Sequence, residues 1–369
     1  MDVNNTFLHG QLAERVYCQQ PDVFIDHDNP DYVCLLDKSL YDLKQARHAW
    51  FDRSAAFLCT ISFVATRSDP SLFVYYHDGC LAYLLQYVNR KYAKVLSGFF
   101  MLQRKYAKEL LDRANMTACK TSLTPVDTRA KLSASDASPV TDCSKYRILV
   151  QALQYLTMTR LDHTYAVRQA CLQMHDPRDQ HLALVKRILR YLRGTTTHVL
   201  DLHHLQALDI VAYLEGDWAG FPNTRRSTSD YTVFLGDTLI SWSSKRQATV
   251  SISSAEAENR VVTECRWLRQ LLGELCVDVP KATVVYCNNI YGVYMAANPV
   301  HHRRTKHIEL DIHFVWEKVA LGEHRVLHIP TMQQFADVMM KGLTTAAFEE
   351  FWSSSCIRPP DACYCHRPS

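Results

Sequence analysis

The sequence predicts a mixed α/β chain of the α+β kind, and three observations carry that prediction. Apolar residues recur at helical spacing in several stretches, which is typical of helices with one buried face. Short apolar runs separated by turn residues lie between residues 210 and 242, as in an antiparallel meander. A continuous apolar run at Thr283–Cys287 is typical of a strand covered on both faces. The chain is therefore expected to contain helices together with two kinds of strand, those of an antiparallel meander and one that is covered on both faces.

Composition places the chain among ordinary globular proteins. Its 369 residues, 47% hydrophobic and 21% charged, suffice for two or three domains. The formal net charge of +3 is compatible with nucleic-acid binding without demanding it. The 13 cysteines include no CxxC pair and the start lacks signal-peptide character, so we expect an intracellular location, cytoplasmic or nuclear. No apolar run approaches the roughly 18 residues of a membrane span, so we expect no membrane partner.

Changes of pattern along the chain predict five segments. Residues 120–141 are polar, lack periodicity and contain Pro125 and Pro139, which is typical of a linker. Before this stretch, helices are expected at Ala46–Leu58 and Tyr106–Leu111. The predicted segments are a first domain at 1–119, the linker at 120–141, a helical connection at 142–205, a second α/β domain at 206–345 and a tail at 346–369.

Three helices are predicted in the connection at 142–205. The second is expected at Tyr165–Met174 with Asp162 as its N-cap, and the third is expected to end at Gly194. The apolar faces are Leu149, Leu153 and Leu156 in the first helix, and Leu182, Val185, Leu189 and Leu192 in the third. The third helix also carries a basic face, made of Lys186, Arg187, Arg190 and Arg193. Such a face can follow a phosphate backbone, but more often it is only a solvated surface.

The segment at 206–345 alternates strands and helices in the order βββαβαβα, which predicts a mixed sheet with helices packed on it. A Gly236-Asp237 dipeptide between two apolar runs predicts a two-residue hairpin turn. The expected strands are Ile210–Tyr213, Tyr231–Leu235, Leu239–Trp242, Thr283–Cys287 and Val326–Ile329. Three helices are expected: one with an apolar face from Val261 to Leu275, one from Ile308 to Val319, and a last one that contains Asp337.

Two glutamates near the start of the first of these helices have different expected roles. Glu256 lies three residues after Ser253, where a capping box requires it, so we expect it to face water. Glu258 precedes Val261 and Val262 by three and four residues, so its carboxylate is expected on the core-facing side. A carboxylate there needs a cation or another partner, which makes Glu258 the candidate metal ligand.

Three stretches of the second half are DWAGFPNTRRSTSDYTVFLGD (Asp217 to Asp237), ISWSSKRQATVSISSAEAE (Ile240 to Glu258) and NPVHHRRTKHIELDIHF (Asn298 to Phe314). They closely resemble the ribonuclease H domain of copia-type retrotransposon Pol polyproteins. The resemblance implies a ribonuclease H-like fold, a Mg²⁺ cofactor and an RNA/DNA hybrid as partner. In that family the metal ligands are an aspartate, a glutamate and two further aspartates. These positions fall here on Glu215, Glu258, Asn288 and Asp337.

Two of the four positions depart from the family pattern. Glu215 keeps the charge of an aspartate but moves it by one methylene, whereas Asn288 removes a charge. Two magnesium ions bring a charge of +4, and the three carboxylates that remain supply only −3. We therefore expect these positions to bind Mg²⁺ poorly and to support no ribonuclease H activity.

Three stretches of the first half are DVNNTFLHG (Asp2 to Gly10), VYCQQPDVF (Val16 to Phe24) and KSLYDLKQARHAW (Lys38 to Trp50). They resemble the palm of the reverse transcriptase in the same polyproteins. Asp2 falls on the first catalytic aspartate, but Asn89 and Arg90 stand where the family has two further aspartates. The side-chain charge at these three positions changes from −3 to 0. The resemblance then resumes well downstream, so we expect a truncated palm remnant without polymerase activity.

Three interpretations of function follow. The preferred one is a degenerate Pol fragment without catalysis. The second is a residual metal-dependent ribonuclease that uses Glu215, Glu258 and Asp337, against which Asn288 argues. The third is a noncatalytic module that binds nucleic acid through its phosphates. The residues expected to contact phosphate are Arg187, Arg190, Arg225, Arg226 and Lys245.

Overall fold

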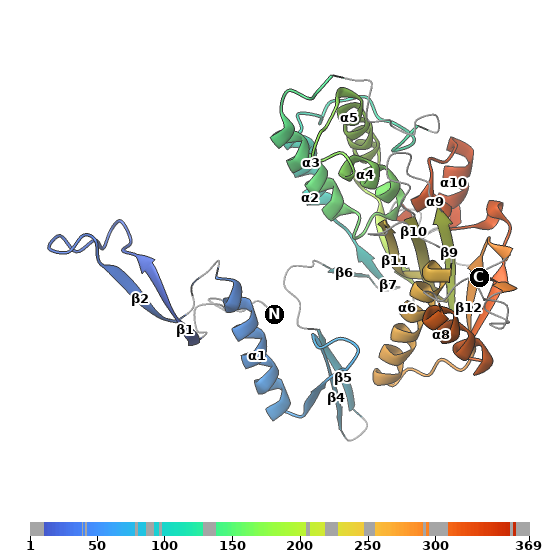
Figure 1. Cartoon of the computed structure of the whole chain (residues 1–369), viewed down its shortest axis with the longest axis horizontal. Helices are drawn as coiled ribbons and strands as arrows, with labels where there is room; N and C mark the ends of the chain where they lie inside the picture. Colours follow the sequence, from blue (N-terminus) through green and yellow to red (C-terminus); the bar gives the residue numbers. More distant parts are fainter. Residues whose placement is uncertain are drawn as a thin grey trace. The chain divides into compact units, whose positions relative to one another are not determined.

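The computed structural model of the chain falls into two compact units (Figure 1). The first unit is Met1–Arg90 with Glu274–Cys276, and the second unit is Lys91–Gly273 with Val277–Ser369. The residues that the structure describes are 11–38, 40, 43–77, 80–85, 92–95, 98–127, 138–203, 207–217, 228–246, 255–290, 293–294, 309–354 and 357–358. No helix among them is long and apolar enough to cross a bilayer.

The first unit contains a hairpin, one helix and a small sheet. Strands β1 (Gln11–Gln19) and β2 (Val33–Lys38) pair antiparallel, and helix α1 (Lys44–Thr60) follows. This helix confirms the prediction at Ala46–Leu58. An antiparallel meander closes the unit, formed by β3 (Phe63–Ala65), β4 (Leu72–His77) and β5 (Cys80–Leu85).

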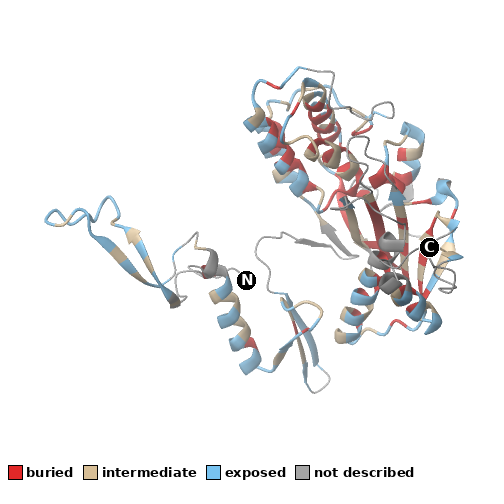
Figure 2. Ribbon diagram, viewed as in Figure 1, coloured by how far each residue is buried: buried red, intermediate tan, exposed pale blue. Residues whose placement is uncertain are grey.

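Little of the first unit is buried (Figure 2). Among its described apolar side chains, only Ala46, Leu58 and Phe73 are buried, and every residue of β5 is exposed. The described part of this unit therefore has no extended core of its own.

The second unit contains a helical layer. It consists of α2 (Arg104–Arg113), α3 (Cys143–Leu156), α4 (Thr164–Cys171) and α5 (Asp179–Gly194). Leu110, Val150, Leu153 and Ile188 are fully buried in one apolar cluster between these helices. The predicted helix positions are confirmed, including the end of α5 at Gly194, because each helix turns its apolar positions into this cluster. The exception is the end of α4, which lies at Cys171 and not at Met174.

The expected N-cap at Asp162 is wrong. Asp162 lies instead in a single 3-10 turn, η2 (Leu161–His163), and the helix that follows begins at Thr164. Its buried carboxylate accepts hydrogen bonds from Arg160 Nε at 2.9 Å and Nη2 at 2.6 Å, and from the hydroxyl of Tyr191. A carboxylate that neutralises a buried arginine is not free to cap a helix, and the second partner, Tyr191, cannot be read from local sequence.

The second unit continues with a mixed five-stranded sheet in the order β11-β10-β9-β12-β13, which confirms the predicted fold class. Strands β9 (Ile210–Asp217), β10 (Thr228–Leu235) and β11 (Thr238–Arg246) form an antiparallel meander. Strand β12 (Thr283–Cys287) runs parallel to β9 and to β13 (His324–His328).

The predicted hairpin turn between β10 and β11 is confirmed. Leu235 pairs with Thr238, so Gly236 and Asp237 are the two turn residues, and Gly236 adopts a φ of +55°. The expectation that β12 is covered on both faces is wrong in part. Thr283, Val285 and Cys287 are buried, whereas Val284 and Tyr286 on the other face are only half-buried.

Helices cover both faces of the five-stranded sheet. On one face, α6 (Ala255–Glu274) and α8 (Glu309–Ala320) join a cluster that contains Ala212 and Val285 of the sheet. On the other face, a second cluster contains residues of α9 (Asp337–Met340) and α10 (Thr345–Ser354). The predicted apolar face of α6 is confirmed at Val261, Cys265, Leu268 and Leu272, which are buried, whereas Leu275 follows the end of the helix and is half-buried.

A second, antiparallel sheet in the order β14-β8-β7-β6 joins distant parts of the sequence. Its strands are β6 (Tyr92–Val95), β7 (Gly98–Met101), β8 (Val199–His203) and β14 (Ile357–Arg358). The second unit thus contains the connection expected at 142–205, the domain expected at 206–345 and the described part of the tail expected at 346–369.

Candidate carboxylate cluster

Strand register brings two of the predicted ligands side by side. In the parallel pair of β9 and β12, Leu214 lies opposite Cys287, so Glu215 and Asn288 are the next residues along. The side-chain amide of Asn288 donates a hydrogen bond to the carboxylate of Glu215. The edge of the sheet therefore assembles these two positions as the sequence predicts.

Asp337 completes the described part of the cluster from the far end of the sequence. It is the first residue of the one-turn helix α9, and its side chain is 10% exposed. Gln334, three residues earlier, fixes this turn to the sheet because its Nε2 donates to the backbone oxygen of Leu214 at 2.8 Å. The same side chain accepts a hydrogen bond from the backbone nitrogen of Ala336 at 3.3 Å. Sequence reasoning missed this role of Gln334.

Three aromatic rings lie two residues before the three cluster positions. Tyr213 stacks on Tyr286 at 5.3 Å between ring centroids and meets Phe335 edge to face at 4.9 Å. Residues two apart in a strand lie on the same face, so Tyr213 and Glu215 share a face of β9. We call Tyr213, Tyr286 and Phe335 the aromatic floor. It supplies a poorly solvated boundary beside the carboxylates.

The two carboxylates are hard to ionise in these surroundings. Burial raises the pKa of Glu215 to about 7, with a further increase from the charge of Asp337, while the hydrogen bond from Asn288 opposes the shift. Burial also raises the pKa of Asp337, against the lowering effect of Lys341. Glu215 Oε2 and Asp337 Oδ1 are buried and have no hydrogen-bond partner among the described residues.

Lys341 is a cation at the cluster that sequence reasoning missed. Its Nζ lies 2.6 Å from Asp337 Oδ2, and its side chain is 48% exposed. The signal in the sequence is the spacing of four residues between Asp337 and Lys341, which is common for helical ion pairs. Many surface pairs share that spacing, so it becomes informative only once Asp337 is known to be buried.

A second ion pair lies next to the cluster. Asp230 of β10 is paired with Glu215 in the sheet and is fully buried. Arg168 of α4 donates to Asp230 Oδ1 at 2.9 Å and also to the hydroxyl of Ser244 on β11. The charge of Asp230 is therefore already balanced by the helical layer, and this pair anchors α4 to the sheet.

Glu258, the fourth predicted ligand, lies in the first turn of α6, and its side chain falls outside the described residues. Val261 and Val262, one turn further along, are both fully buried. This side of α6 therefore faces the sheet, and the role of Glu258 as a ligand stays a prediction.

The described side chains do not fit a pair of divalent ions. Glu215 and Asp337 contribute two negative charges at most, and the positive charge of Lys341 offsets one of them. No group of three His, Cys, Asp or Glu suited to a metal ion occurs among the side chains that the structure describes. The two unpartnered carboxylate oxygens would suit a single cation, but a two-metal cluster needs more negative charge than these residues carry.

The other predicted site residues are scattered. Asp2, Asn89 and Arg90, and also Arg225 and Arg226, lie outside the described residues. Lys245 is exposed near the end of β11.

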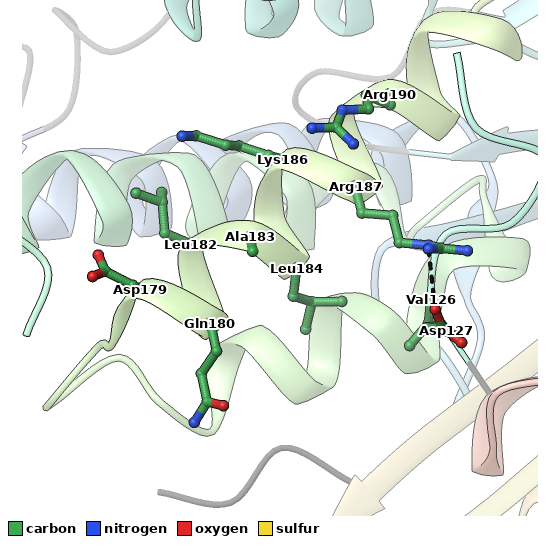
Figure 3. A pocket seen from close by; sticks show the side chains of 10 residues that line it. All are labelled: Val126, Asp127, Asp179, Gln180, Leu182, Ala183, Leu184, Lys186, Arg187 and Arg190. Carbon is green, nitrogen blue, oxygen red and sulfur yellow. Dashed lines mark ion pairs between the residues drawn. The ribbon is translucent and has the colours of Figure 1, made fainter. Parts of the chain in front are cut away.

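A hollow of about 550 Å³ lies along α5 beside Val126 and Asp127 (Figure 3). The guanidinium of Arg187 turns toward that segment, where it pairs with Asp127 at 3.5 Å and donates to Thr124 Oγ1 at 2.9 Å. Lys186 and Arg190 are exposed at the hollow, one helical turn apart. Of the predicted phosphate contacts on α5, Arg187 is thus engaged within the chain and Arg190 faces solvent.

The first 88 residues match a family model. The model is described as reverse transcriptase (RNA-dependent DNA polymerase), and the match covers residues 1–88.

Two curated relatives from Arabidopsis thaliana match almost the whole chain. The retrovirus-related Pol polyprotein from transposon RE1 is 40% identical over 393 residues, which cover 96% of this chain and 27% of the relative. The corresponding polyprotein from transposon RE2 is 39% identical over 404 residues, which cover 98% of this chain and 28% of the relative. The chain therefore spans about a quarter of the length of these relatives.

Among solved structures, the chain is similar to an LC11 ribonuclease H1 that was crystallised in complex with an RNA/DNA hybrid. The sequence identity is 17% and the TM-score 0.28, over 36% of this chain and 93% of that chain.

Proposed function

The chain belongs to the copia-type retrotransposon Pol polyproteins, and from this premise we propose that its ribonuclease H-like part does not cleave RNA/DNA hybrids. The chain combines a segment similar to reverse transcriptase with a ribonuclease H-like sheet. Enzymes of both kinds are generally Mg²⁺-dependent, so the charge at the metal-binding positions decides whether catalysis is supported.

One observation carries the proposal: among the described residues, Glu215 lies beside a neutral amide and Asp337 lies beside a lysine. The two-metal mechanism requires carboxylates that hold both ions next to the scissile phosphate. Here Asn288 contributes no charge, and the ammonium of Lys341 lies 2.6 Å from Asp337. Glu215 carries only part of a negative charge near neutral pH, because its pKa is raised to about 7. Together these features favour a domain that keeps the ribonuclease H-like fold but has lost the catalytic activity.

The polymerase is proposed to be inactive on sequence grounds. Arg90 stands where the family has an aspartate. At about 4 Å and an effective dielectric constant near 20, two unit charges interact by roughly 4 kcal/mol, so an arginine would repel a divalent ion by about twice that amount. A divalent ion would not bind beside such a residue.

A cleavage assay tests the proposal. The purified chain is incubated with a labelled RNA/DNA hybrid in Mg²⁺ or in Mn²⁺, next to the variants Asn288→Asp and Asp337→Asn. We expect no cleavage by the unaltered chain. Gain of cleavage by Asn288→Asp would show that the missing charge is the defect. Cleavage by the unaltered chain that disappears in Asp337→Asn would refute the proposal, and equal cleavage by all three would identify a contaminating nuclease.

A noncatalytic role in binding nucleic acid is the second candidate, and the hollow along α5 favours it. Lys186 and Arg190 are exposed there, one turn apart on the same helix. Two such cations can bind neighbouring phosphates, and removal of each cation should reduce the log–log slope of the salt dependence by about 0.7 to 0.9. Fluorescence anisotropy with a labelled hybrid between about 50 and 200 mM salt tests this, with Lys186→Ala and Arg190→Ala together and Lys281→Ala as the control. An unchanged slope in the double variant would exclude this surface.

A further inference from the structure

Lys341 is attached to Asp337 twice. Its backbone nitrogen donates to the backbone oxygen of Asp337 at 3.1 Å, which closes the single turn of α9. Its ammonium group lies 2.6 Å from Asp337 Oδ2. The backbone contact and the ion pair together place the ammonium next to the cluster.

The cluster needs a cation at this place. Asp337 is nine-tenths buried, and a buried carboxylate without a partner is costly. Arg168 pairs with Asp230, on the neighbouring strand, and Asn288 offers Glu215 a hydrogen bond but no charge. Among the described residues, Lys341 is the cation that lies against Asp337, and its charge also favours the ionised form of Glu215.

We propose that Lys341 is a tethered counter-ion of the carboxylate cluster, which keeps this edge of the sheet folded without a divalent ion. The ammonium takes the place beside Asp337 that a metal ion would otherwise occupy. Since the lysine is part of the chain, no entropy of association opposes it, and Mg²⁺ has to displace it before it can reach Asp337 Oδ2. The half-exposed stem of Lys341 allows such displacement, so the lysine sets how strongly the cluster responds to divalent ions.

This inference deepens the proposed function because it concerns the same cluster, but its readout is stability and not cleavage. Cleavage by the unaltered chain would refute the proposed function and leave the role of Lys341 open to this separate test.

The experiment measures the thermal midpoint of the full chain in EDTA and in 10 mM MgCl₂ or CaCl₂, with NaCl at matched ionic strength. The variants are Lys341→Met, which keeps the length of the stem, and Lys341→Arg, which keeps the charge. Lys281→Met is the matched control, because Lys281 also forms an ion pair, at 2.8 Å from Asp209, but both partners are exposed.

We expect the unaltered chain and Lys281→Met to have midpoints that divalent ions change by less than about 1 °C. Lys341→Met should lose about 3 to 6 °C in EDTA and regain at least half of that loss in Mg²⁺ or Ca²⁺. Lys341→Arg should resemble the unaltered chain. The inference is overturned if the unaltered chain gains as much from Mg²⁺ as Lys341→Met does, or if Lys341→Met is neither destabilised in EDTA nor responsive to the ions.

Discussion

Tyr213 and Phe335 meet edge to face, with ring centroids 4.9 Å apart, two residues before Glu215 and Asp337 respectively. One ring comes from a strand near the middle of the sequence and the other from the loop before α9, so this contact aligns two distant segments. The carboxylates that follow are thereby brought to the same edge of the sheet. The aromatic floor therefore helps to set the geometry of the cluster, together with the strand register and Gln334.

The first prediction concerns that floor. Phe335→Ala should lower the free energy of unfolding by about 2 to 4 kcal/mol, because it removes a half-buried ring and its contacts with Tyr213, Phe234 and Phe351. Phe335→Leu should cost about half as much, since it keeps most of the apolar volume. Urea denaturation followed by circular dichroism measures both changes. Equal losses for the two variants would contradict a role that depends on the ring.

The second prediction is a pH dependence of stability. The pKa of Glu215 is raised from 4.5 to about 7 in the folded chain, so the folded state holds a proton that the unfolded state has already released. The contribution of Glu215 to stability is therefore fully present below about pH 4.5 and is lost as the pH rises through about 7. Denaturation series across this range, for the unaltered chain and for Glu215→Gln, measure it. A flatter profile for Glu215→Gln is expected, and identical profiles would refute the assignment.

The third prediction concerns the ion pair between Arg168 and Asp230. Arg168→Met should destabilise the second unit by roughly 3 to 5 kcal/mol, because it leaves the fully buried carboxylate of Asp230 without its cation. Arg168→Met combined with Asp230→Leu should cost less than Arg168→Met alone, since no buried charge is then left unpaired. Lys281→Met breaks an exposed ion pair and should cost less than about 1 kcal/mol. Urea denaturation of the three variants compares them.

The fourth prediction is that restoring the missing aspartate destabilises the chain when no metal is present. Asn288→Asp replaces a hydrogen-bond donor to Glu215 with a second carboxylate, so the two like charges repel each other. We expect a lower thermal midpoint in EDTA, with partial recovery in Mg²⁺. Asn289→Asp is the neighbouring control and should respond less to Mg²⁺. A midpoint of Asn288→Asp equal to that of the unaltered chain would argue against the close contact between residues 215 and 288.

Periodicity predicted the framework of the second unit well. The apolar face of α6, the end of α5 at Gly194 and the turn at Gly236 all follow from local rules, because each depends on neighbours within a few residues. The order of strands and helices then restricted the arrangement to a mixed sheet, which the structure confirms. The prediction that Glu215 and Asn288 lie at one edge of the sheet required only the directions of two strands, which are β9 and β12 in the structure.

Partners from distant segments could not be predicted in the same way. Asp162 looked like a helix cap because its immediate neighbours allow that role, but in the fold its carboxylate is bound by Arg160, two residues away, and by the distant Tyr191. The pair of Arg168 and Asp230 joins a helix to a strand that is far away in sequence. Nothing in the composition of either segment selects that partner.

The pairing of β14 in the second sheet has a consequence for how the chain folds. Ile357 of β14 is fully buried and pairs with Leu200 of β8, while β8 also pairs with β7, so this sheet closes only when segments from both extremes of the second unit meet. Such a topology has high contact order, so the entropy cost of closing the long loop is incurred before the strand pairing can stabilise the fold. During synthesis on the ribosome, the unit cannot be completed until residue 358 has left the exit tunnel. Its final assembly is therefore expected to be slow.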